Sequence, residues 1–145
     1  MNVLKIGGIA VAAALTAVPA APAPASAQSL PQCYGQRIAR EQIRTNGVIG
    51  TYLEVFYTPS NATICAYVNT TEQSKQTRKR MLVALRQCAD RGSGCSTWST
   101  LRTENELTRS GRLAVKRTKP CFQGFGATQW GDHEWGHTTT SAICP

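Results

Sequence analysis

Six cysteines constrain this chain more than any other feature, because in a short chain they decide which segments lie together. They are Cys33, Cys65, Cys88, Cys95, Cys121 and Cys144. An even number of cysteines in a small exported domain indicates three disulfides rather than free thiols or metal ligands. Six cysteines allow fifteen pairings, so the connectivity stays open at this point. The short Gly/Ser-containing loop 89–94 makes a Cys88–Cys95 disulfide the pair that spacing itself indicates.

The first 27 residues have the pattern of a secretory signal peptide. Lys5 precedes the apolar run 6–18, a Pro/Ala segment follows, and residues 25–27 form a small-residue cleavage site. We therefore expect a secreted mature protein of one domain, residues 28–145, in an oxidising extracellular or cell-surface compartment. The apolar run is shorter than the roughly 20 residues of a membrane-spanning helix, and no later segment is longer, so we expect no membrane span.

Short β-type segments separated by turns recur through the mature region. Residues 51–57 and 63–68 are β-branched and aromatic and flank a turn cluster at 58–61, which predicts a hairpin. Further strands are expected at 81–85, 96–103 and 113–117, and a closing hairpin within 122–143. Such a series is typical of a β-sandwich or barrel.

Two segments depart from the strand pattern. Residues 69–80 are polar and lack an apolar periodicity, so they predict an exposed loop. Residues 36–45 carry Ile38, Ala39 and Ile43 among polar residues, which predicts one or two helical turns that end at the following Asn-Gly pair. The expected fold class is therefore all-β, a small disulfide-stapled sandwich or barrel with one short N-terminal helix.

Residues 133–137 match the HExxH pattern of zinc peptidases. In that pattern His133 and His137 would bind zinc and Glu134 would activate water, provided that a helix places both imidazoles on one side. Glycines at 131 and 136 and three threonines after 137 disfavour a helix, and the chain has no third histidine. We therefore prefer a strand that carries both histidines and Trp135 on one face, with no cofactor, and keep a zinc-dependent hydrolase as the alternative.

The mature region is basic. Only Lys5 of the 16 Lys and Arg residues lies in the signal, which leaves 15 basic and 8 acidic residues and a formal charge of +7. The candidate anion-binding residues are Lys75, Arg78, Lys79, Arg80, Lys116, Arg117 and Lys119. Such charge either keeps a secreted protein in solution or attracts an anionic partner, and both interpretations stay open.

The class of partner follows from the expected location. An exported protein meets wall, coat and matrix polymers first, and no helix-turn-helix, zinc finger or RNA-binding motif is present in the sequence. We therefore expect an anionic polymer rather than a specific nucleic acid. A small basic ribonuclease that uses Glu and His, and a protease inhibitor that presents the 88–95 loop, are further alternatives. The sequence does not indicate an oligomeric state.

One stretch of the mature chain resembles a known family. The matching features are Gly50-Thr51, an apolar strand that ends at Tyr57, a Ser60-Asn61 turn, and Cys65 four residues after the asparagine. They resemble the corresponding hairpin of the spore-associated protein A-like family of small exported actinobacterial proteins. Cys33, Cys121 and Cys144 are similar to the rest of that family's cysteine frame.

The resemblance implies a compact β domain outside the cell or at the spore surface, in a family with no established activity. It carries over no catalytic residue, and this chain departs from the pattern in its basic 69–80 segment and its histidine-bearing tail. If four cysteines belong to the family frame, the two extra ones pair with each other, which implies Cys33–Cys65, Cys88–Cys95 and Cys121–Cys144. We therefore expect a non-enzymatic, spore-associated or otherwise extracellular protein that binds an anionic wall, spore-coat or matrix polymer.

Overall fold

The computed structural model of this protein describes residues 32–145. The expected signal peptide and its cleavage site lie outside these residues. The described chain forms strands β1 (Gln36–Thr45), β2 (Val48–Thr58), β3 (Thr63–Thr70), β4 (Lys79–Cys88), β5 (Ser99–Glu106), β6 (Leu113–Lys116), β7 (Cys121–Trp130) and β8 (Gly136–Thr139), and a short 3-10 helix η1 (Pro59–Asn61).

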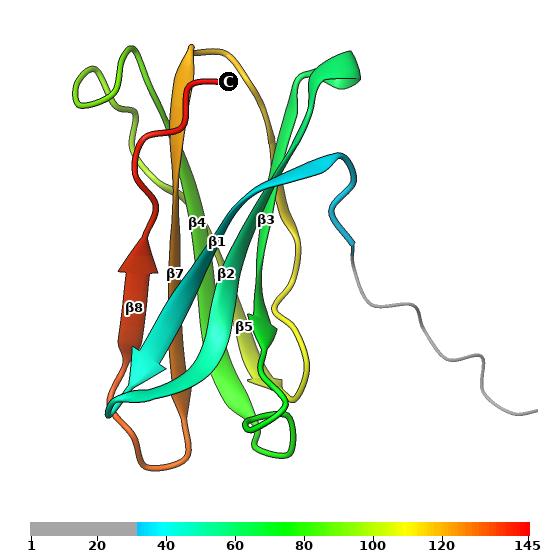
Figure 1. The fold of residues 1–145 in the computed structure, drawn as a ribbon, viewed down its shortest axis with the longest axis vertical. Helices are drawn as coiled ribbons and strands as arrows, with labels where there is room; N and C mark the ends of the chain where they lie inside the picture. The colour runs from blue at the N-terminus through cyan, green and yellow to red at the C-terminus, as the bar shows by residue number, and fades with distance from the viewer. Residues whose placement is uncertain (1–31) are drawn as a thin grey trace, which may run out of the picture.

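The strands form two antiparallel four-stranded sheets, with the orders β1-β2-β3-β6 and β5-β4-β7-β8. The two sheets face each other as the layers of a sandwich (Figure 1). The expected all-β, disulfide-stapled fold is thus confirmed and is a sandwich. The expected hairpins are β2–β3 and β7–β8, and both pair in antiparallel register.

Alternation along the central strands builds the core between the sheets. In β2, Leu53 and Val55 point inward and are fully buried, and in β4 Met81, Val83 and Leu85 do the same from the other sheet. Successive side chains of a strand point to opposite faces, so the residues between them lie on the outer face of each sheet. The outer faces therefore carry the side chains that a partner can reach.

The expected N-terminal helix is wrong, because residues 36–45 form strand β1. This strand pairs with β2 from Gln36 to Thr45, with irregularities in register after Arg37 and after Ile43. The Asn46-Gly47 pair has positive φ at both positions, 49° and 79°, which is the geometry of a tight two-residue hairpin turn. Pairing along the whole of β2 buries Ile43, and this outweighs the weak local preference for helix.

Three disulfides lie toward one end of the sandwich, and they join the pairs that the family resemblance implies. Cys33–Cys65 attaches the segment before β1 to β3, Cys88–Cys95 closes the loop after β4, and Cys121–Cys144 attaches the C-terminal segment to β7. No cysteine of the described chain is free.

Two boundaries differ from expectation. Strand β5 begins at Ser99 rather than at 96 and continues to Glu106. The loop expected at 69–80 ends earlier, because β4 begins at Lys79, and this lysine is buried rather than exposed.

Candidate functional site

The HExxH segment is not helical. Residues 131–135 form the turn between β7 and β8, and only His137 of the two histidines lies in a strand. The expected single strand with both histidines and Trp135 is therefore also wrong. The local cause is glycine: Gly131 adopts φ +58°, and Gly136 lies so close to β1 that an added Cβ would be 2.2 Å from the carbonyl oxygen of Arg44.

The two imidazoles consequently have separate surroundings. His133 Nδ1 lies 2.7 Å from the side-chain nitrogen of Asn46, and its ring lies 4.8 Å from that of Trp130. His137 instead stacks on Phe125, at 6.0 Å between ring centroids and 23° between planes. The helical geometry that the zinc alternative requires is absent here, and the described residues contain no group of three or more His, Cys, Asp or Glu that could hold a metal ion.

The candidate anion-binding residues lie at opposite ends of the sandwich. Strand β4 starts at Lys79, which pairs with Trp130, and ends at Cys88, which pairs with Cys121. Nine residue steps along a strand span about 30 Å. The cluster at 75–80 and the cluster at 116–119 therefore form two separate groups, not one patch.

The basic side chains of residues 116–119 fasten loops. Lys116 Nζ donates to the carbonyl of Asn61, and Lys119 Nζ donates to that of Gly94. Arg117 donates to the hydroxyl of Tyr57 at 2.9 Å and to the backbone oxygens of residues 119, 120 and 145. At this end of the molecule the basic side chains are therefore hydrogen-bonded within the protein itself.

Lys79 has a structural role at the other end. Its side chain is buried, and Nζ donates to the carbonyl oxygens of Ser74, Thr77 and Leu107. Burial lowers its pKa from 10.5 to about 8. Lys75 forms an ion pair with Glu72 on the exposed loop. Lys79 also lines the hollow beside its two neighbouring arginines, but its Nζ is bound to backbone carbonyls, and Lys75 does not line that hollow.

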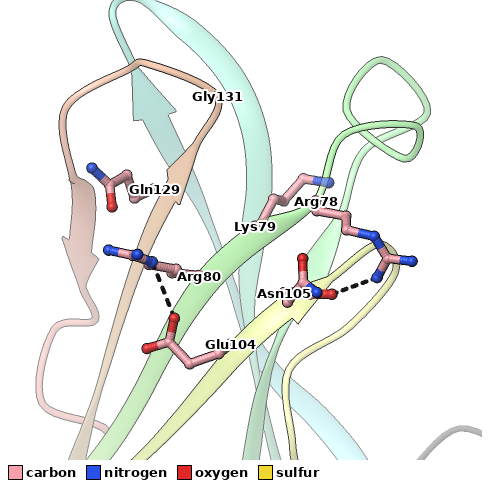
Figure 2. A pocket seen from close by; sticks show the side chains of 7 residues that line it. All are labelled: Arg78, Lys79, Arg80, Glu104, Asn105, Gln129 and Gly131. Carbon is pink, nitrogen blue, oxygen red and sulfur yellow. Dashed lines mark hydrogen bonds and ion pairs between the residues drawn. The ribbon is translucent and has the colours of Figure 1, made fainter.

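Arg78 and Arg80 line a hollow of about 410 Å³ at this end of the second sheet. Figure 2 shows side chains from three strands around it: Arg80 from β4, Glu104 from β5 and Gln129 from β7. Arg80 Nε lies 3.1 Å from Glu104, and Arg78 donates to the carbonyl of Asn105 at 2.7 Å. A guanidinium has five N–H donors, so one such bond does not saturate either arginine.

A β-bulge shapes this hollow. The register of β4 with β5 shifts between Lys79 and Met81, and Asn105 on the bulged strand has φ +62°. Bulges end regular pairing and re-aim side chains, and they are common beside functional sites. Here the bulge places the Asn105 carbonyl against Arg78 and leaves Glu104 beside Arg80.

The outer face of the second sheet also carries aromatic residues that sequence reasoning missed as a site. Trp98 lies 6.0 Å from Phe125, and Trp135 is 40% exposed beside them. A spacing of two residues does indicate that Phe125 and Ala127 share a face with Gln129. The sequence gives no signal, however, that Trp98 from the neighbouring loop joins them.

On the outer face of the first sheet, charged side chains pair with one another and cover aromatic rings. The side chain of Glu54 is only 5% exposed, and it lies 2.9 Å from Arg37 and 3.2 Å from Arg40. Arg40 also covers the ring of Tyr52 at 3.8 Å, and Arg109 covers that of Tyr67 at 4.3 Å. Burial and the neighbouring Glu54 carboxylate raise the pKa of Tyr67. This network satisfies a buried carboxylate and stiffens β1 against β2.

Comparisons with known proteins return nothing for this chain: no family model, no curated protein and no solved structure matches it. Among residues 32–145, no helix is long and apolar enough to cross a membrane. The candidate site therefore rests on its own geometry.

Proposed function

We propose that this is a secreted, non-enzymatic binding protein of the extracellular or spore surface, which holds an anionic polymer at the hollow between Arg78 and Arg80. The observation that carries the proposal is that two arginine side chains, Arg78 and Arg80, line one open, polar hollow (Figure 2). Arginine suits this task because its planar, fixed donors bind carboxylate or phosphate groups with two parallel hydrogen bonds.

The rest of the molecule supports a binding role. The formal charge of the mature region favours anionic partners, and the three disulfides suit an oxidising compartment. Among the described residues that line the hollow, Glu104 is the only acidic one, and its carboxylate faces Arg80. An arriving anion competes with this carboxylate for the guanidinium, so Glu104 weakens binding and favours polymers with many charges.

The test is the affinity of the folded mature protein for polyphosphate of defined length, measured as a function of salt. We expect Arg78→Gln/Arg80→Gln to weaken binding about tenfold, equivalent to about 1.4 kcal/mol, and to reduce its salt dependence. Glu104→Gln should strengthen binding, because it removes the competing carboxylate while it keeps a side chain of the same shape.

The matched control is Lys116→Gln/Lys119→Gln, which removes the same charge from the opposite end of the sandwich. We expect it to change affinity less than twofold. Equal losses in the two double variants would show that net charge alone attracts the polymer, and polyphosphate binding that is indifferent to salt would overturn the electrostatic basis of the proposal.

A further inference from the structure

The outer face of the same sheet extends beyond the hollow at Arg80. On β4 the outward residues after Arg80 are Leu82 and Ala84, and on β7 their partners are Ala127 and Phe125. Because every second residue of a strand faces the same side, these small and apolar side chains form the floor beyond the charged end. The polar hollow and this apolar floor are thus neighbouring parts of one surface.

Two further hollows lie over this floor. One, of about 240 Å³, is lined by Leu82, Arg102, Phe125, Ala127, Trp135 and His137. The other, of about 380 Å³, is lined by Leu82, Ala84, Trp98, Thr100, Phe125 and Thr139. They share Leu82 and Phe125, so they adjoin. We call the three hollows together the β4–β7 groove; from Arg80 to Ala84 it follows β4 for about 13 Å.

Aromatic rings stand along the apolar part of this groove. Phe125 is central, with Trp98 on one side and His137 on the other, each 6.0 Å away between ring centroids. Trp135 stands at the edge of the groove. Thr100 from β5 and Thr139 from β8 add hydroxyl groups to its walls. Flat apolar rings next to hydroxyl groups match a chain of sugar rings, whose faces are apolar and whose edges carry hydroxyls.

The charges of the groove are almost all positive. Arg78 and Arg80 line its polar end, Arg102 lines the hollow beside Trp135, and Arg86, just beyond the groove, covers the ring of Trp98 at 4.6 Å. Among the described residues that line the three hollows, Glu104 is the only carboxylate. The groove is therefore complementary to a polymer that combines rings with negative groups.

We propose that the ligand of the β4–β7 groove is an acidic polysaccharide, with sugar rings stacked on Trp98, Phe125 and Trp135 and acid groups bound by the arginines. This rests on the proposed function and names the class of its polymer. A single-stranded nucleic acid also combines rings with charge. The hydroxyl groups of Thr100 and Thr139 in the walls of the apolar part favour the glycan, because the edges of sugar rings carry the hydroxyl groups that pair with them.

The test compares four probes on the mature protein by calorimetry: polygalacturonate, neutral dextran, polyphosphate and an oligo-dT strand. We expect polygalacturonate to bind more tightly than dextran or oligo-dT. Trp98→Ala and Trp135→Ala should each weaken polygalacturonate binding at least about fivefold, as is typical when a stacking ring is removed. Both should leave polyphosphate binding within twofold, because polyphosphate has no ring to stack.

Tyr34→Ala is the matched control, because Tyr34 is the most exposed large aromatic of the described chain, at 71%, and lines none of the three hollows. It should leave binding of every probe unchanged. Thermal unfolding of each variant verifies that the sandwich has formed. If Trp98→Ala does not fold, Trp135→Ala alone tests the stacking of sugar rings.

The outcomes separate the two proposals. If Arg80→Gln weakens polyphosphate binding while the tryptophan variants bind polygalacturonate like the wild type, the anion site stands and the groove inference is overturned. Tighter binding of oligo-dT or of dextran than of polygalacturonate also overturns it. If no anionic probe binds at all, the proposed function itself fails.

Discussion

Lys79 is the buried charge on which the loop before β4 depends. It is 1% exposed, and its ammonium group satisfies three backbone carbonyls, those of Ser74, Thr77 and Leu107. Lys79→Met leaves these carbonyls without their donor, and an unsatisfied buried polar group costs about 1–3 kcal/mol. We expect urea unfolding at pH 7 to show a loss of about 2–3 kcal/mol. Lys75→Met, which removes only an exposed ion pair, should cost less than about 1 kcal/mol, and equal losses would contradict the carbonyl role.

The same lysine gives stability a defined pH dependence. Its pKa is about 8 in the folded protein and 10.5 in the unfolded chain, since burial disfavours the charged form. Between these values the unfolded chain binds a proton that the folded protein has released, so the free energy of unfolding rises with pH. From pH 8 to pH 10.5 the free energy of unfolding rises by about 3 kcal/mol. The same amount is lost when the pH falls from 10.5 back to 8. Lys79→Met lacks this rise, so the stability gap between the two proteins should widen from pH 8 to pH 10.

At the scale of single elements, the two sheets approach each other closely where β8 begins beside the end of β1. Gly136 is buried there, and a Cβ at this position would lie 2.2 Å from the Arg44 carbonyl oxygen and 2.7 Å from Thr45 Oγ1. We expect Gly136→Ala to lower the free energy of unfolding by about 1–3 kcal/mol, as overpacking of a well-filled site does. Chemical denaturation measures this loss.

Gly92→Ala is the comparison for this prediction, because a Cβ at Gly92 meets open space and its φ is not in the left-handed region. That substitution should leave stability within about 0.5 kcal/mol, as surface changes usually do. If the two variants unfold alike, the edges of the sheets are not in contact at Gly136.

The elements also show where sequence reasoning succeeds and fails. Alternation and β-branched composition locate β2, β3, β4 and β6 well, because those strands are half-buried or fully buried and the pattern records burial. Strand β1 is mispredicted because Ile38, Ala39 and Ile43 suit a helical spacing as well, and because Asn46-Gly47 is equally compatible with a helix end. Only the pairing with β2 distinguishes a hairpin turn from a helix stop, and pairing is not local information.

Only part of the candidate site can be predicted from the sequence. Arg78 and Arg80 are found from charge alone, although the same criterion selects Lys79, which is buried, and Arg117, which fastens loops. The aromatic part of the β4–β7 groove depends on the register of β4 with β7 and on the loop that carries Trp98. The HExxH match is a short pattern, and its glycines prevent the helix that would place both imidazoles on one side.

For the whole molecule, the three disulfides should contribute unequally to stability. Cys33–Cys65 closes a loop with a sequence separation of 32, whereas Cys88–Cys95 closes one of 7. In the chain-entropy model a cross-link stabilises by restricting the unfolded chain, by about 3.7 kcal/mol for the first loop and about 2.4 kcal/mol for the second. We therefore expect Cys33→Ala/Cys65→Ala to lose about 1 kcal/mol more than Cys88→Ala/Cys95→Ala in urea unfolding.

The location of the two bridges strengthens this expected order. The first attaches the segment before β1 to β3, while the second lies within one surface loop after β4. Without Cys33–Cys65 the N-terminal segment is free to separate from the sheet, and β1 is an edge strand of its sheet. A larger loss in the Cys88/Cys95 variant would mean that the 88–95 loop supports β4 and β7 directly, and that these native contacts outweigh the entropy of loop closure in the unfolded chain.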